Sequence, residues 1–457
     1  MGLSGGKIMV VEKRIQQPTV STYYKNKKPS DVRLGSLKFS KREDNVALIN
    51  CAIGNVTLPM YPKMIERLHN IGQSGLYFDD GVVKYEATKG HPETIAAFKN
   101  VLKQQGFDVS NLEVQVTDGA SMAMEIAVLG ICGEPGEDDK PLLMFDPTYT
   151  NYNSVTKRLG RKTVTVNRKL SESGDFTFPT VEEIEEVIIK ENPTGMLIIP
   201  YDNPTGQLYS EEMMLEIAKL CVKHNLWLLS DEAYRGLFYD ENRKIISIWG
   251  ITEAEVPGIT GRRISLESTS KVFNACGLRI GALITDNKLF HEKTEAEYTT
   301  NLSANSIGQY IFGALAYESK EDIFSWLKNS RNYYRTINVA MYQKLKEVNP
   351  NFIVSKPQSS IYLVVDVKNV VSPGFNSIEF VSYCAEKGNV LIDGVPTTLL
   401  VASMAGFYNK VNGQKNPGET QFRLSFCDPA EKLQHVPYLL NALLMDFEKE
   451  RLMNKII

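Results

Sequence analysis

Short apolar runs that alternate with helical patterns are the feature of this sequence that most restricts its fold. Residues 142–146 (LLMFD), 195–199 (GMLII) and 227–231 (WLLSD) each have the length of a buried strand and stop at an aspartate or before a proline. Between the last two runs, residues 211–224 carry apolar residues at helical spacing. This alternation predicts an α/β fold, in which ligands bind beyond the carboxyl ends of the strands.

Composition excludes several classes of protein. A chain of 457 residues with 43% hydrophobic and 23% charged residues is ordinary for a globular protein and too long for one core, so we expect two domains. A net charge of −3 gives no electrostatic reason to bind nucleic acid. No apolar run approaches the roughly 20 residues that span a bilayer, and no apolar signal core begins the chain. We therefore expect a cytoplasmic protein that binds no membrane.

The cysteines and histidines indicate no metal site. The six cysteines are far apart, without a C-x-x-C pair, and no histidine lies at ligand spacing from them. Buried thiols in a reducing compartment explain this pattern better than disulfides or metal ligands do.

Lys271 is the residue that most strongly suggests chemistry. It follows a strand-like run, residues 263–268, and a hydroxyl-rich turn that includes Ser268 and Ser270, and Arg279 stands eight residues later. A desolvated lysine near another cation releases its proton more readily and becomes a nucleophile. Hydroxyls and an arginine suit a phosphate, so the stretch suggests a phosphorylated aldehyde held as a Schiff base on Lys271. The alternative is a surface lysine in a turn between two core strands.

This stretch resembles the lysine motif of the class I and II aminotransferases, which are fold type I pyridoxal-phosphate enzymes. The matching residues are Ser268, Ser270, Lys271, Gly277, Arg279 and Gly281. The resemblance implies that pyridoxal 5'-phosphate is bound to Lys271 as an aldimine, with Ser268, Ser270 and Arg279 among its ligands. It also implies a homodimer.

The same resemblance implies a particular domain organisation. The large domain is expected to be a mostly parallel seven-stranded sheet between helices, and the smaller α/β domain to be built from both chain ends. We place the small domain at residues 45–75 and 330–457 and the large, cofactor-binding domain at residues 76–329. Residues 1–44, with ten Lys or Arg and four Asp or Glu, are interpreted as an arm over the body or a partner subunit, or as a partly disordered tail.

A turn at residues 118–121 predicts an anion site. It lies between a strand-like run, residues 112–117, and a helical pattern, and backbone N–H groups at the start of a helix attract anions. Many α/β proteins have such turns. The family binds its cofactor phosphate at this position, which makes Ala120 and Ser121 the candidates.

Polar and aromatic residues after three other runs match family positions around the cofactor ring. A carboxylate at the end of an apolar strand, such as Asp231, is costly to bury unless it meets a cation, and a pyridinium nitrogen is one. By resemblance Asp231 holds that nitrogen, whereas Asn203 and Tyr234 meet the phenolic oxygen. An aromatic side chain stacks on the ring in this family; Tyr149 is the match, and Tyr152 is the alternative. Lys271, Asp231 and Tyr234 are the expected catalytic residues.

Fewer residues of this chain match the positions at which the family binds its substrate. By resemblance Arg423 binds the α-carboxylate bidentately, with Gly54 and Asn203 beside it. Tyr85 matches a tyrosine that reaches the cofactor phosphate of the neighbouring subunit, although an ordinary loop tyrosine is the simpler alternative. Dicarboxylate-specific members of one branch carry an arginine where this chain has Thr299, which argues against an aspartate-specific enzyme.

The resemblance implies transamination between an L-amino acid and a 2-oxo acid through pyridoxamine phosphate. Two alternatives stay open. One is a lyase, decarboxylase or oxidase of the same fold, because the same residues serve all of these reactions. The other is a ligand-sensing module on a retained fold, against which the intact Lys271, Asp231 and Arg423 argue. No role is assigned to residues 1–44 or to the long loop at residues 401–418.

Overall fold

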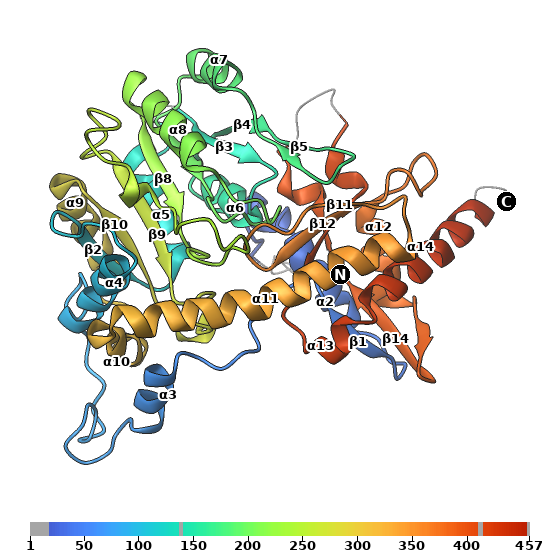
Figure 1. Ribbon diagram of the computed structural model, residues 1–457, viewed down its shortest axis with the longest axis horizontal. Coiled ribbons are helices and arrows are strands. Elements are labelled where there is room, and N and C mark those ends of the chain that lie inside the picture. Colours follow the sequence, from blue (N-terminus) through green and yellow to red (C-terminus); the bar gives the residue numbers. More distant parts are fainter. Residues whose placement is uncertain (1–17, 137–139, 410–414, 455–457) are drawn as a thin grey trace, which may run out of the picture.

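A seven-stranded sheet forms the centre of the larger unit of the molecule (Figure 1). The computed structural model describes residues 18–136, 140–409 and 415–454. In sheet order the strands are β2 (Glu113–Thr117), β10 (Gly281–Thr285), β9 (Arg263–Ser268), β8 (Trp227–Asp231), β7 (Gly195–Ile198), β3 (Leu142–Asp146) and β4 (Thr163–Asn167). Only β10 in this sheet runs against its neighbours. The mostly parallel seven-stranded sheet expected from the sequence is confirmed.

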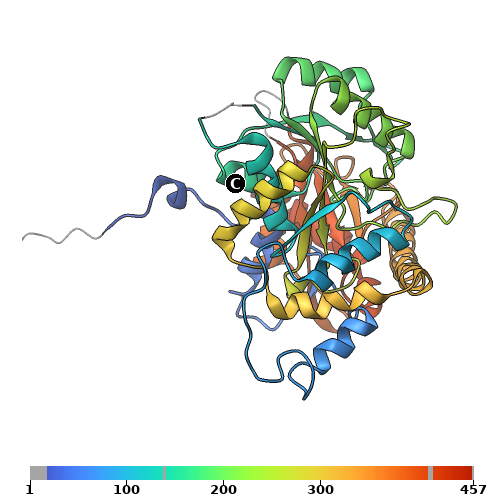
Figure 2. The ribbon, with the colours of Figure 1, turned by 90° about the vertical axis from the view of Figure 1, so that its left-hand side faces the viewer.

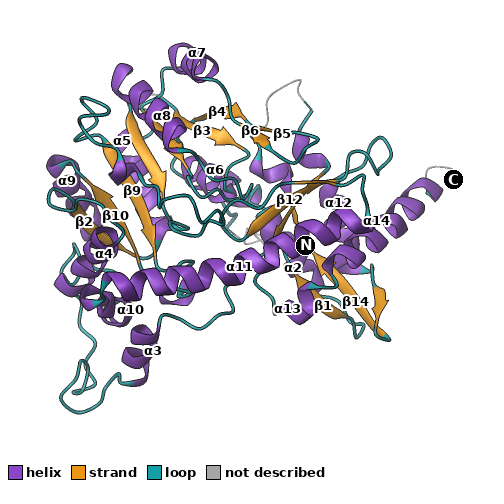
Figure 3. Ribbon diagram, in the orientation of Figure 1, coloured by secondary structure: helices purple, strands orange, loops and turns teal. Residues whose placement is uncertain are grey.

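Alternate residues of these strands enter two separate cores. Leu143, Met196 and Leu228 pack on one face of the sheet, whereas Leu142, Leu197 and Leu229 pack on the other. Helices lie on both faces (Figure 3), which explains why the strands read as continuous apolar runs. The helices of this unit are α3 (Pro62–His69), α4 (Pro92–Gln104), α5 (Ala120–Cys132), α6 (Thr150–Arg158), α7 (Val181–Glu191), α8 (Glu211–Lys223), α9 (Lys288–Tyr298) and α10 (Ser306–Gly313).

Both ends of the described chain build a smaller unit with its own core. Its first sheet has the order β11 (Ile353–Val354), β12 (Tyr362–Asp366), β16 (Gln421–Ser425) and β15 (Ala402–Ser403); its second joins β1 (Ala47–Asn50), β14 (Val395–Leu400) and β13 (Val390–Ile392). The helices are α2 (Asp31–Phe39), α12 (Ser377–Glu386), α13 (Ala430–Leu433) and α14 (Val436–Met453). The parallel pairing of β1 with β14 ties the N-terminal part of the chain to the C-terminal part.

The predicted domain boundaries stay predictions, and two observations bear on where they could be drawn. Tyr61 and Met64, which we assigned to the small domain, are buried in the core beneath the seven-stranded sheet. The long helix α11 (Lys320–Val348) contains the predicted boundary at residue 330 and runs from the larger unit to the smaller one (Figure 1).

The described part of the N-terminal arm divides into two pieces. Helix α1 (Thr22–Lys25) lies on a segment that stands away from the body in Figure 2. Helix α2 packs on α12, where a Cβ atom added to Gly35 would come within 3.1 Å of Val381. Residues 1–17 of the arm lie outside the described residues. Among the helices described, none is long and apolar enough to cross a membrane.

Candidate active site

A cavity of about 470 Å³ lies where the carboxyl ends of the parallel strands face the smaller unit. It is lined by every site residue predicted from the sequence except Tyr85. These residues are Gly54, Ala120, Ser121, Tyr149, Asn203, Asp231, Tyr234, Ser268, Ser270, Lys271, Arg279 and Arg423. Side chains separated by more than 300 residues in the sequence therefore meet in one place.

Lys271 follows β9 by three residues, and its Nζ donates a hydrogen bond to the carbonyl oxygen of Gly54. Burial lowers the pKa of the Lys271 amine below its ordinary value; Arg423 and Arg279 act in the same direction, and the thiol of Cys427 opposes them. The lysine is therefore more easily deprotonated than an exposed one, as a nucleophile or a general base requires.

One end of the cavity is built to receive an anion. Helix α5 begins after Gly119, whose φ of 83° favours glycine, and a Cβ atom there would lie 2.4 Å from Nη2 of Arg279. Arg279 donates to the carbonyl oxygens of Cys276 at 2.9 Å and Asp118 at 3.4 Å. The N–H groups at the start of α5 thus lie beside a guanidinium group.

Asp231 ends β8 and also lines the cavity. The hydroxyl of Tyr152 donates to its Oδ2, and the N–H of Ala233 donates to its Oδ1 at 3.0 Å. Burial raises the pKa of this carboxyl group, partly offset by these two hydrogen bonds. The ring of Tyr149 meets that of Tyr152 edge to face, with centroids 5.6 Å apart. Both predicted aromatic candidates line the cavity, but Tyr152 is the one bonded to Asp231.

Arg423 on β16 is held in a fixed position. It donates from Nη1 to Oδ1 of Asn203 at 2.8 Å and from Nη2 to the carbonyl oxygen of Ala52 at 2.7 Å. Its guanidinium carbon lies 4.3 Å from the ring centroid of Tyr362 and 5.1 Å from that of Phe407. Its buried Nε has no acceptor within the described part of the chain, so one donor is left for an anion.

Tyr362, at the start of β12, is a cavity residue that we missed. Its hydroxyl lies 2.6 Å from that of Tyr234, and a Cβ atom on Gly54 would lie 2.4 Å from it. Glycine at position 54 therefore makes room for Tyr362, and its carbonyl oxygen accepts from Lys271. The apolar run of residues 361–367 predicts a strand but does not indicate that its first tyrosine lines a cavity.

Arg33 is a second residue that we missed. It projects from α2, lines the cavity, and has no carboxylate partner among the described residues. Its charge acts on the phenol of Tyr149, since it is one of the groups that lower the pKa of that phenol against the dominant effect of burial. We had assigned no chemistry to residues 1–44, and the packing of α2 is what brings this guanidinium to the site.

Two other predicted positions lie outside the cavity. Tyr85 is 77% exposed, in a segment fixed by the hydrogen bond from Glu86 N–H to the hydroxyl of Ser303 at 3.2 Å. Thr299 lies in a short 3-10 helix, Thr299–Asn301, and does not line the cavity either.

Comparison with known protein sequences identifies relatives of this chain. Residues 47–435 match the family model for "Aminotransferase class I and II". The chain is 25% identical over 357 residues to the aspartate aminotransferase of Sulfolobus acidocaldarius, covering 78% of this chain and 83% of that protein. It is 26% identical over 359 residues to the aspartate aminotransferase of Pyrococcus horikoshii, covering 78% of this chain and 81% of that protein.

Solved structures show the same fold. N-succinyldiaminopimelate aminotransferase from Mycobacterium tuberculosis superposes with a TM-score of 0.74 at 22% identity, over 93% of this chain and 100% of that one. Aspartate aminotransferase from Thermus thermophilus superposes with a TM-score of 0.75 at 18% identity, over 93% of this chain and 100% of that one. The chain belongs to the class I and II aminotransferases, a family of pyridoxal-phosphate-dependent enzymes.

Proposed function

We propose that the cavity at Lys271 is where this aminotransferase holds pyridoxal 5'-phosphate and exchanges the amino group of an L-amino acid with a 2-oxo acid. The observation that carries this proposal is that Lys271 shares one cavity with two guanidinium groups, those of Arg279 and Arg423, which both act on its charge. Two anion sites and an amine of lowered pKa in one cavity suit a phosphate at one site and a carboxylate at the other.

The donor set fits the cofactor. The N–H groups of Ala120 and Ser121, the hydroxyls of Ser268 and Ser270, and Arg279 would hold the phosphate. The glycine at position 119 supports this assignment, since a side chain there would collide with Arg279.

The ring would lie among polar and aromatic groups. Asp231 would face the ring nitrogen, Asn203 and Tyr234 the phenolic oxygen, and Tyr149 one face of the ring. When bound, pyridoxal phosphate supplies an aldehyde and an electron-accepting ring. The carboxylate of Asp231 favours a protonated ring nitrogen, because two opposite charges stabilise each other in a buried site.

Lys271 would bind the cofactor and, once released by the incoming amine, move a proton at the substrate α-carbon. Arg423 would orient the α-carboxylate, and Gly54 and Asn203 would lie beside it. Tyr362 closes this side, where it stacks on Arg423 and lies next to Tyr234.

Arg33 supports an acidic side chain on the substrate. Arg279 and Arg423 are assigned to the phosphate and the α-carboxylate, which leaves Arg33 as the cavity arginine without an assigned anion. A substrate with a second carboxylate would use it. Our inference from Thr299 favours the opposite choice of substrate; it considered one position for such an arginine and not the N-terminal helix.

The assembly and compartment are further parts of the proposal. We propose a homodimer in which Tyr85, exposed in a single chain, reaches the cofactor phosphate of the partner. The six cysteines are all unpaired, which suits a reducing compartment such as the cytoplasm.

A half-reaction tests the proposed function. The holoenzyme is mixed with one L-amino acid at a time, the visible absorption of the cofactor is recorded, and the product is identified. We expect at least one donor, dicarboxylic ones first, to convert the cofactor to its amine form with one 2-oxo acid released per site. Catalytic release of carbon dioxide or ammonia would instead support the lyase, decarboxylase or oxidase alternative, and binding without any product would support a sensing module.

A further inference from the structure

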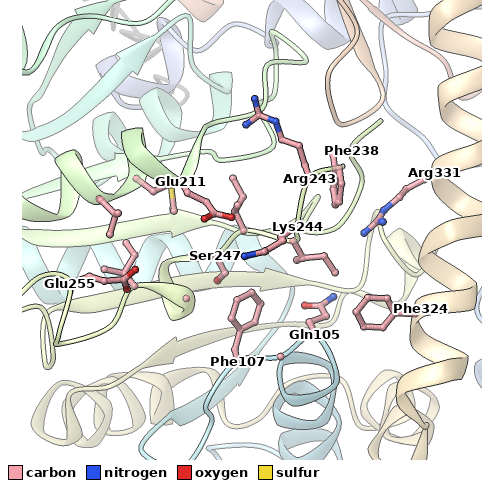
Figure 4. Close-up of a pocket in the computed structure, with 17 residues that line it drawn as sticks. Gln105, Phe107, Glu211, Phe238, Arg243, Lys244, Ser247, Glu255, Phe324 and Arg331 are labelled. Atoms are coloured by element: carbon pink, nitrogen blue, oxygen red, sulfur yellow. The ribbon is translucent and has the colours of Figure 1, made fainter. Parts of the chain in front are cut away.

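A second and larger cavity, of about 600 Å³, lies in the larger unit (Figure 4). Its walls come from residues 105–107 just after α4, the start of α8, residues 238–255 and α11. It shares no lining residue with the cavity at Lys271. Its volume is in the range of small-molecule sites, about 300–1,000 Å³.

Aromatic and aliphatic side chains line this cavity together with charged and polar ones. Phe107 and Phe324 stand on either side of Gln105 in Figure 4, and Phe238 lies across from them. Met214 and Ile245 add aliphatic surface. Phe324 is 36% exposed although it lies on α11 beside these rings. An apolar or aromatic body would cover surface that now faces water.

The guanidinium group of Arg331, which lines this cavity, has an unused donor. Arg331 on α11 donates from Nε to the carbonyl oxygen of Gly236 at 2.6 Å, and its guanidinium carbon lies 3.9 Å from the ring centroid of Phe238. These contacts fix the orientation of the group. Its Nη2 is buried and has no acceptor among the described residues. A buried donor on a cation is costly to leave unpaired, and an anion would satisfy it.

The other charged side chains that line the cavity indicate which charge its ligand carries. Arg243 stands 3.8 Å from Asp240, with both side chains about half exposed, and Lys244 adds a second cation on the same segment. Two carboxylates, Glu211 and Glu255, also line the cavity. Glu255 is already bonded to Thr252, but both would repel a doubly charged phosphate. A single carboxylate suits this balance better.

Gln105 supplies a fixed amide group in the same cavity. Its Oε1 accepts from Nε of Arg235 at 2.6 Å, which fixes the side-chain amide and leaves the NH₂ group as a donor. Arg235 is itself paired with Glu267 at 2.6 Å, so the amide is anchored in a buried network.

We propose that this cavity is a binding site, separate from the active site, for a small monocarboxylate with an aromatic or branched apolar body. The carboxylate binds Arg331, and the body lies against Phe107 and Phe324. The site takes part in no bond-making step, and its existence does not depend on the function proposed for Lys271.

The probe is 3-phenylpropionate, and 3-phenylpropan-1-ol is its uncharged counterpart. Binding to the holoenzyme is measured by titration calorimetry for wild type, Arg331→Met and Arg335→Met. Arg335 is the matched control, since it lies one turn along α11 and pairs with exposed Glu241 at 2.6 Å. We expect a binding event that weakens at least about tenfold in Arg331→Met, changes less than about twofold in Arg335→Met, and is weak for the alcohol.

A second variant keeps the test decisive if Arg331→Met folds poorly. Leu215→Trp fills the cavity without removing a charge, and we expect the same loss of binding with unchanged circular dichroism. The proposal is overturned if the probe does not bind wild type, if Arg331→Met binds it as wild type does, or if Leu215→Trp retains the binding event. Binding that disappears only when Arg423 is replaced would place the probe in the active site, and would also overturn it.

Discussion

The two cavities contain similar kinds of side chain but differ in the chemistry that those side chains can support. Each has a guanidinium group against an aromatic ring, with Arg423 4.3 Å from Tyr362 and Arg331 3.9 Å from Phe238. Only the smaller cavity contains an enclosed lysine of lowered pKa and, facing the same space, a buried carboxylate. The larger cavity has an exposed lysine, Lys244. Placement of an amine and an acid, and not cavity volume, is our reason for proposing the smaller cavity as the reactive site.

The largest expected effect concerns the arginine of the active site. Arg423→Lys keeps the charge but loses the paired geometry with Asn203 and Ala52. We expect kcat/KM for an amino acid to fall by about 10²-fold or more, because bidentate carboxylate binding needs the guanidinium plane. The matched exchange in the larger cavity, Arg243→Lys, should leave kcat/KM within about twofold. Similar losses in both variants would mean that the two cavities are coupled in catalysis.

The second prediction concerns substrate choice. Arg33→Met should lower kcat/KM for a dicarboxylic amino acid about tenfold and leave an apolar amino acid nearly unaffected, since only the former has a second carboxylate to lose a partner. Lys38→Met is the control on the same helix, because Lys38 pairs with Glu386 at 2.9 Å, away from the cavity. Equal losses for both substrates would contradict a role of Arg33 in recognising the side chain.

How far these residues could be foreseen depends on where they lie relative to the strands. Asp231, Ser268 and Lys271 lie at or just beyond strand ends. Because the apolar runs in the sequence show where these strands end, they place the three residues at one edge of the sheet. Arg33 could not be placed, because it reaches the cavity only through the packing of α2 on the smaller unit. Tyr85 stays a prediction, since its proposed partner is another subunit.

The fold, like the candidate site, could be predicted only in part from the sequence. Apolar runs separated by helices indicated the α/β class, and the family resemblance implied a mostly parallel sheet between helices, but nothing in residues 281–285 indicated that β10 runs in the reverse direction. The larger cavity could not be predicted from the sequence. Gln105, Phe238 and Arg331 belong to no motif and meet only because α4 and α11 pack beside the same loop.

The third prediction is a pH dependence at Lys271. The neutral amine reacts with the aldehyde of pyridoxal phosphate, so the rate at which apoenzyme recombines with the cofactor should fall as pH drops through the pKa of Lys271. Because that pKa is lowered, the rate should persist to lower pH than for an ordinary lysine. Arg423→Met removes a neighbouring cation and should move the midpoint upward. A midpoint at the ordinary value of lysine in wild type, or an unchanged midpoint in the variant, would contradict the electrostatic argument.

The smallest effect is expected for the lysine of the larger cavity. Lys244→Met should change kcat less than about twofold, since Lys244 is exposed and lies outside the cavity at Lys271. Steady-state kinetics with the preferred donor measures this. A loss comparable with that of Arg423→Lys would remove the distinction between a reactive and a binding cavity.

The central claim is that Lys271 moves the proton in amino-group transfer, and the most direct test compares wild type with Lys271→Ala as cofactor-loaded proteins. Both are mixed with the same L-amino acid, and cofactor absorption and 2-oxo acid are followed together. We expect wild type to convert its cofactor with one 2-oxo acid per site, and the variant to do so at least about 10³-fold more slowly while still binding the cofactor. Formation of 2-oxo acid by Lys271→Ala at the wild-type rate would contradict the account.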